Sequence, residues 1–105
     1  MSAIAGTWDL ALRTPIGTLR AEYRFEQSAD GLHGTAKGPE ETVPLANITT
    51  GADPAGERVT WQQRVTKPIR LNLAFEVVVT GDTLTGHSRA GRLPRTRVTG
   101  RRVPT

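Results

Sequence analysis

The sequence lacks cysteine, so disulfide bonds and thiolate nucleophiles are excluded. No stretch approaches the ~18 apolar residues of a membrane-spanning helix. The N-terminal residues also lack the basic region and the long apolar run of a secretory signal. We therefore expect a cytoplasmic protein with no membrane partner.

Acidic residues are missing from one end of the chain. Residues 83–105 contain six arginines and no Asp or Glu, whereas residues 1–82 contain eight Lys/Arg and ten Asp/Glu. Phosphate binding would use such a cluster, but five aromatic residues in the whole chain are too few for a base-stacking platform. We therefore do not expect nucleic-acid binding, and interpret the cluster as a solvated face.

Helical periodicity is absent, and a two-residue alternation takes its place. Residues 19–26 alternate apolar and charged side chains without a break, which is typical of a half-buried antiparallel strand. Glycine- and proline-rich turn signals separate runs of this kind. Together these patterns predict eight strands at about 6–14, 17–28, 31–37, 42–50, 57–66, 69–80, 83–90 and 95–103.

The chain also matches itself. Thr7-Trp8 and Thr60-Trp61 are each followed by six intervening residues and then by Pro-Ile. Further pairs match at an offset of 52 after the turn. We interpret this pattern as an internal duplication, about 6–50 and 59–103, within one domain spanning 1–105.

Two four-stranded halves with apolar inner faces leave unpaired edges unless the sheet closes. We therefore predict an all-β fold: an eight-stranded antiparallel up-and-down barrel, lipocalin-like, made of two similar halves. The alternative is an open sandwich of two sheets, divided at the loop 51–56.

Short motifs along the chain carry a family resemblance. Gly6-Thr7-Trp8 at the first strand, with Arg101 and Arg102 in the last, resembles the lipocalin and calycin pattern, in which an arginine packs across the tryptophan. The chain also resembles small, largely uncharacterised bacterial proteins that begin with GTW. The resemblance implies a barrel. The chain is much shorter than a typical lipocalin, and the several pocket tryptophans of avidins have no counterpart beyond Trp8 and Trp61.

The predicted inner face is mostly apolar core, and a few of its residues suggest a pocket. The inward positions are Trp8, Leu10, Leu12, Leu19, Ala21, Tyr23, Phe25, Leu32, Val59, Trp61, Val65, Leu71, Leu73, Phe75, Val77 and Leu84. Two residues of this face are polar, Tyr23 and also Gln63, which lies between Trp61 and Val65, and a buried polar group needs a partner. They either present polar atoms to a ligand or bond each other or the backbone. We expect ligand binding by Trp8, Tyr23, Trp61, Gln63 and Phe75.

Catalytic and metal signals are weak. His33 and His87 fall on the outward parity without further ligands at metal-binding spacing, so we expect no metal. No phosphate loop, hydrolase elbow or zinc-protease motif is present, and no cofactor is implied. On the predicted outer face Ala74 and Val78 are apolar, which leaves a homodimer open as an alternative.

Three hypotheses about function follow. The first is a non-catalytic barrel that binds a small, mostly apolar metabolite. The second is a cofactor-independent cyclase or isomerase in which Tyr23 donates a proton and Gln63 orients a carbonyl. The third is a protein-interaction module that uses the arginine-rich last strands.

Overall fold

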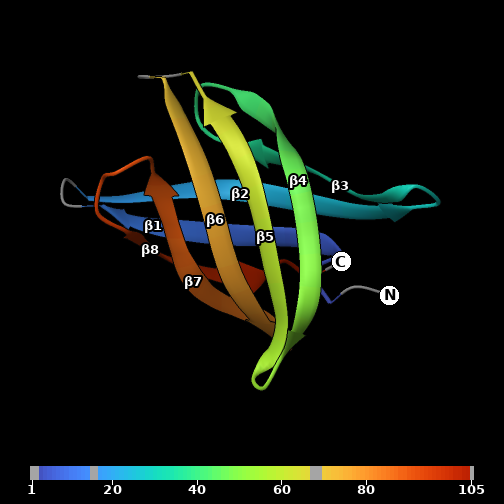
Figure 1. Cartoon of the computed structure of the whole chain (residues 1–105). Helices are drawn as coiled ribbons and strands as arrows, with labels where there is room; N and C mark the ends of the chain where they lie inside the picture. The colour runs from blue at the N-terminus through green and yellow to red at the C-terminus, as the bar shows by residue number, and fades with distance from the viewer. Residues whose placement is uncertain (1–2, 15–16, 67–69, 105) are drawn as a thin grey trace.

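The computed structural model describes residues 3–14, 17–66 and 70–104 and contains eight strands. The strands close into one up-and-down barrel in chain order, each antiparallel to the next, with β8 paired to β1 (Figure 1). No helix in the described part of the chain is long and apolar enough to cross a membrane. The strands are β1 (Gly6–Thr14), β2 (Gly17–Ser28), β3 (Gly31–Lys37), β4 (Thr42–Asp53), β5 (Gly56–Val65), β6 (Leu71–Thr80), β7 (Thr83–Ala90) and β8 (Thr96–Arg102).

The closed barrel confirms the predicted fold class and excludes the open sandwich. The predicted loop at 51–56 is wrong, because β4 continues to Asp53 and pairs there with Gly56 across a two-residue turn. Gly56 has a φ of 154° and lies against the Val79 carbonyl of β6, a place that a side chain could not share. The sheet therefore passes without a break between the two halves of the chain. Isoleucine 69, in the predicted sixth strand, lies outside the described residues.

The core follows the predicted parity, and fifteen of the described residues are hydrophobic and buried inside the barrel. The prediction is wrong for Leu19, whose side chain is 57% exposed. This residue lies beyond the last β2–β3 pair, Glu22 with Lys37, so no strand covers it on that side. Five inward residues are only half-buried: Ala21, Leu32, Val65, Leu71 and Leu73. The inward list omits several buried residues: Ile4, Ala36, Val43, Val79, Ser88 and Val98.

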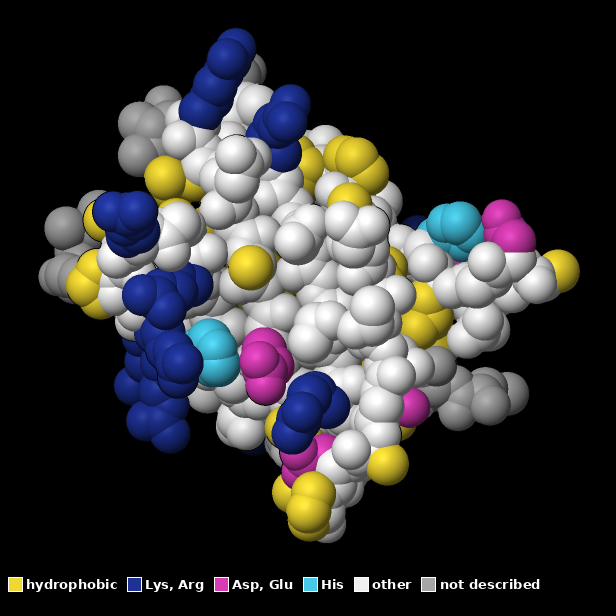
Figure 2. All heavy atoms as spheres, in the orientation of Figure 1, with side chains coloured by type: hydrophobic (Ala, Val, Ile, Leu, Met, Phe, Trp, Pro, Cys, Tyr) yellow, Lys and Arg dark blue, Asp and Glu magenta, His cyan; other side chains and the backbone are white. Residues whose placement is uncertain are grey.

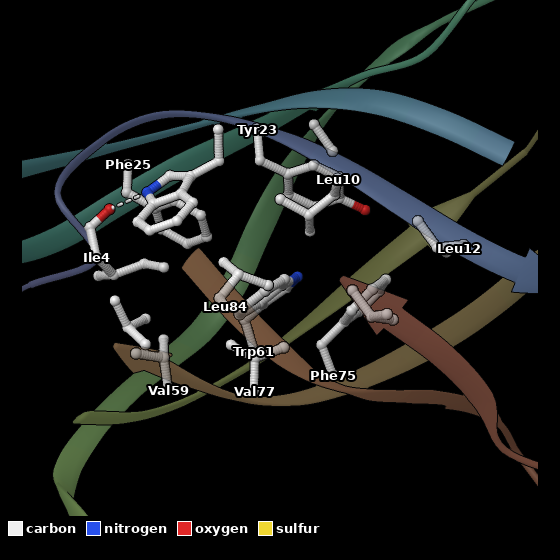
Figure 3. Packing of buried hydrophobic residues seen from close by; sticks show 14 of the residues in the cluster. Ile4, Leu10, Leu12, Tyr23, Phe25, Val59, Trp61, Phe75, Val77 and Leu84 are labelled. Carbon is white, nitrogen blue, oxygen red and sulfur yellow. Dashed lines mark hydrogen bonds between the residues drawn. The ribbon is translucent and has the colours of Figure 1, made fainter. Parts of the chain in front are cut away.

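The two ends of the barrel differ. At one end, the segment before β1 places Ile4 inside the barrel, where its carbonyl accepts a hydrogen bond of 2.8 Å from Trp8 Nε1 (Figure 3). We call this the capped end. At the other end, the strands end among partly exposed apolar side chains such as Leu71 and Leu73. We call this the rim; it carries the β3–β4 and β7–β8 connections.

Candidate functional site

Four aromatic side chains fill the middle of the barrel. Trp61 stacks on Phe75 with ring centroids 4.8 Å apart, and Phe25 meets Trp61 edge-on at 5.2 Å. The Tyr23 ring lies 5.8 Å from Trp61 and 6.0 Å from Phe75. All four side chains are at most 2% exposed. The mid-section is therefore a packed aromatic core.

One glutamine satisfies the polar atoms of this core. The Tyr23 hydroxyl donates to Gln63 Oε1 at 2.9 Å, and Trp61 Nε1 donates to the same oxygen at 3.1 Å. Because an indole N–H can only donate, Trp61 fixes which end of the amide is the oxygen. Figure 3 shows the Tyr23 hydroxyl directed away from Ile4, toward the Leu12 side of the barrel. Of the two arrangements left open by the sequence, the structure has the one in which Tyr23 and Gln63 bond each other.

The other end of the Gln63 amide is still available. In the described part of the chain no hydrogen bond uses Gln63 Nε2, and no fully buried side-chain nitrogen or oxygen lacks a partner. This NH₂ group is therefore accessible to solvent, although the side chain as a whole is 7% exposed. It can donate hydrogen bonds to a bound oxygen atom.

Burial changes the acidity of Tyr23. Desolvation raises the pKa of its hydroxyl well above the ordinary value, and the hydrogen bond to Gln63 lowers it by less. A phenol in this state gives up its proton reluctantly. It is better suited to holding Gln63 in place than to protonating a substrate.

Two open hollows lie along strands β4 to β7. The larger has a volume of about 880 Å³, and the smaller about 300 Å³. Both are lined by Gln62, Ala74 and Arg89, so the two hollows lie next to each other, and we call them together the wall groove. Gln62, Ala74 and Arg89 alternate with the buried residues of their strands and therefore face outward. The larger hollow also reaches inward-facing residues at the rim, Gln63 and Leu73.

An irregularity in β4 shapes one side of the wall groove. The β4–β5 register shifts between Ala46 and Thr49, and Asn47 adopts a φ of 53°. Asparagine tolerates this left-handed conformation better than most residues. Its Nδ2 donates to Gln62 Oε1 at 2.8 Å, which ties the bulge to the floor of the groove. Bulges of this kind redirect side chains, and Asn47 lines the smaller hollow.

The structure brings together four of the five predicted site residues. Tyr23, Trp61, Gln63 and Phe75 contact one another in the barrel centre, whereas Trp8 packs at the capped end beneath Arg102. Of the five, Trp61, Gln63 and Phe75 also line the wall groove.

The sequence singles out Ala74, Leu73 and His87 for other reasons and does not predict a groove on the outer wall. Asn47 and Arg89 also line the groove, and both are outward-facing residues of strands. Alternation identifies the inner face only. It carries no signal for a hollow that depends on a bulge and on the curvature of the wall.

The histidines do not assemble a metal site. His33 lies 3.0 Å from Asp30 in the β2–β3 hairpin and helps to lower the pKa of that carboxyl to about 2. His87 lies opposite Glu76 on the outer face. Among residues 3–14, 17–66 and 70–104 there is no group of three or more His, Asp or Glu side chains that could hold a metal ion.

The arginine expected from the family resemblance is Arg102. Its guanidinium carbon lies 4.4 Å from the centre of the Trp8 ring, and its nitrogens donate to the carbonyls of Ala3 and Ala5 and to Asp82. Arg101, on the opposite parity, is exposed. Comparison of the chain with family models, with curated proteins and with solved structures gives no match. The argument about function therefore depends on the barrel and its wall groove.

Proposed function

We propose that the protein is a non-catalytic, lipocalin-like binding barrel for a small, mostly apolar molecule, and that the larger hollow of the wall groove holds this molecule. Its volume of about 880 Å³ falls in the ordinary range for ligand pockets, about 300–1,000 Å³. That hollow is the observation that carries the proposal. The cytoplasmic location expected from the sequence belongs to the same proposal.

The lining of the larger hollow indicates the chemistry of the ligand. Apolar residues of β4 and β6 offer contact area, and Gln63 Nε2 offers a hydrogen-bond donor where the groove meets the rim. Arg64 and Arg89 stand beside these residues. A compact apolar body with one carbonyl or hydroxyl oxygen fits this combination. The apolar lining residues are Val43, Pro44, Ala46, Leu73 and Ala74.

The cyclase or isomerase alternative has less support. It needs Tyr23 as a proton donor, but the hydroxyl already donates to Gln63 and burial raises its pKa. The ring is also enclosed among other aromatic side chains. A substrate would have to displace the core of the barrel to reach it.

A blocking substitution tests the proposal. Ala74 is exposed and lines both hollows, so Ala74→Trp would fill the wall groove without disturbing the core. Thr85→Trp is the matched control, because Thr85 is exposed on the outer face of β7 and is not among the lining residues. We expect the native protein and Thr85→Trp to bind anilinonaphthalene sulfonate saturably, and Ala74→Trp to bind it at least about tenfold more weakly.

The same variants apply to a natural ligand. Native mass spectrometry of gently purified protein should show a retained small molecule in the native chain and in Thr85→Trp, and less of it in Ala74→Trp. Equal binding by all three proteins would place the ligand elsewhere. An absence of saturable probe binding together with a clean apo spectrum would remove the proposal.

A further inference from the structure

We infer that the arginine-rich outer face of β7, β8 and β1 is a docking surface for an acidic segment of a partner protein. This surface, which we call the basic face, consists of Arg13, Arg89, Arg92, Arg95 and Arg97. All five are exposed, and they lie toward the rim. The inference does not depend on the small-molecule proposal above.

The strand register concentrates positive charge on the basic face. Arg13 of β1 lies directly opposite Arg97 of β8, and Arg97 lies opposite His87 of β7. Like charges in directly opposite positions repel each other and destabilise a sheet. The other cross-strand neighbours of these arginines are uncharged, with Thr18 beside Arg13 and Ala74 beside Arg89. The fold therefore keeps an unfavourable arrangement of charges on this face.

Among the residues that the structure describes, no acidic side chain forms an ion pair with these arginines. The ion pairs among the described residues belong to other groups: Asp30 with His33, Asp53 and Glu76 with Arg58, and Asp82 with Arg102. Figure 2 shows the result as a dark blue band along the β7–β8 side of the molecule. Exposed guanidinium groups without a carboxylate partner are free to bind one in another molecule, two hydrogen bonds at a time.

The geometry includes a seat for a carboxylate. Arg89 and Arg95 line the smaller hollow of the wall groove, together with hydrogen-bonding side chains such as Asn47 and Gln62. Glu76 lines it too, and its carboxylate is paired with Arg58 at 3.8 Å. The Arg89 Nε donates to the Leu93 carbonyl at 3.1 Å, which orients its guanidinium group. An acidic side chain entering this hollow would meet two arginines, and its neighbours along the segment would reach Arg97 and Arg13.

A short acidic segment suits the basic face better than a nucleic acid does. Acidic residues lie close to the face: Glu76 on β6, and Asp9 with Glu22 on β1 and β2, nearer the capped end. A duplex carries one charge per ~1.7 Å over a long surface, so its backbone would run onto these carboxylates. All the aromatic rings are buried, which leaves none for stacking on bases.

The inference is tested by titrating the protein into a fluorescein-labelled poly-glutamate peptide of about ten residues and following anisotropy. We expect saturable binding that weakens severalfold between ~50 mM and ~200 mM salt. Arg13→Gln/Arg97→Gln should weaken it at least about tenfold. The control Arg24→Gln/Lys37→Gln removes the same charge from exposed positions on β2 and β3 and should change it less than about twofold.

Thermal unfolding of both double variants checks that they are folded. Because Arg13 and Arg97 repel each other, Arg13→Gln/Arg97→Gln should unfold at a temperature no lower than the native protein does. Equal loss of binding in the two double variants would show that binding depends on net charge and not on the basic face, and would overturn the inference. Absence of binding at low salt would overturn it too. So would tighter binding of a duplex DNA of matched charge, which would assign the face to nucleic acid.

Discussion

Gln63 shows how a single side chain can make an apolar barrel accommodate two polar rings. The Tyr23 hydroxyl and the Trp61 indole are both buried, and both donate to the same oxygen. A buried donor without a partner costs about 1–3 kcal/mol, whereas a satisfied one contributes about 0.5–1.5 kcal/mol net. Gln63 thus contributes more to the stability of the core than either of the two groups that donate hydrogen bonds to it.

This difference predicts the order of two substitutions. Gln63→Leu leaves two buried donors without an acceptor, and we expect it to lower the free energy of unfolding by about 2–4 kcal/mol. Tyr23→Phe removes one donor and leaves the Trp61 bond in place, so it should cost about 1 kcal/mol. Urea unfolding followed by tryptophan fluorescence measures both. A larger loss for Tyr23→Phe would show that the network does not work in this way.

At the scale of the strands, two glycines occupy corresponding places in the two halves but have different surroundings. A Cβ on Gly86 of β7 would come within 2.6 Å of the Val77 Cα on β6 and would collide with the Glu76 carbonyl. A Cβ on Gly34 of β3 would come within 2.8 Å of Leu45 Cδ1, the end of a side chain, and its nearest backbone atom would be the Arg24 carbonyl oxygen at 3.0 Å. Gly86 therefore allows the backbones of β6 and β7 to approach closely. A side chain at this position would collide with backbone atoms of β6, which cannot move aside as a side chain can.

We accordingly expect Gly86→Ala to destabilise the protein by about 3 kcal/mol or more, because β6 and β7 would have to separate. Gly34→Ala should cost about 1–2 kcal/mol, since Leu45 can move aside. Thermal unfolding monitored by far-UV circular dichroism compares the two. Similar losses of stability in the two variants would mean that β7 can shift as easily as the Leu45 side chain.

The strands were predictable because their chemistry is local. Alternation in residues 19–26 and 71–79 determines which face each strand buries, and the turn residues mark where strands reverse. The stretch from Gly51 to Gly56 is rich in glycine and contains proline, which predicts a loop, so the end of β4 was predicted too early. The bulge at Asn47 and the exposure of Leu19 depend on what neighbouring strands do, which a single stretch of sequence does not record.

The candidate site was predictable only in part. Tyr23 and Gln63 stood out because polar residues on an apolar face need partners, and the structure pairs them. The wall groove did not stand out, because it is made largely of ordinary outward-facing residues such as Gln62 and Arg89. Internal duplication stays a prediction from the sequence.

At the scale of the whole molecule, Arg102 joins the two ends of the chain. It reaches the carbonyls of Ala3 and Ala5 before the first strand and covers the Trp8 ring, and its Nε also donates to Asp82. Only an arginine has enough donors in one plane to make these contacts together. The capped end is therefore closed by the last strand acting on the segment before the first.

We expect Arg102→Ala to lower the free energy of unfolding by about 2–4 kcal/mol, because charged hydrogen bonds and the ring contact are lost together. Arg102→Lys should fall between the alanine variant and the native protein. Asp82→Ala, which removes an exposed ion pair, should cost less than about 1 kcal/mol. Guanidinium unfolding of the three variants provides the comparison; an aspartate effect as large as that of Arg102→Ala would assign the closure to the ion pair.

The contrast between the capped end and the rim has a consequence for how such a chain can evolve. Contacts at the capped end stabilise the closed barrel, so substitutions there lower the free energy of unfolding. The rim and the outer wall carry half-exposed residues whose replacement leaves the closed strand pairing intact. Substitutions that change binding specificity can therefore accumulate at the rim and the outer wall, while selection for stability preserves the capped end.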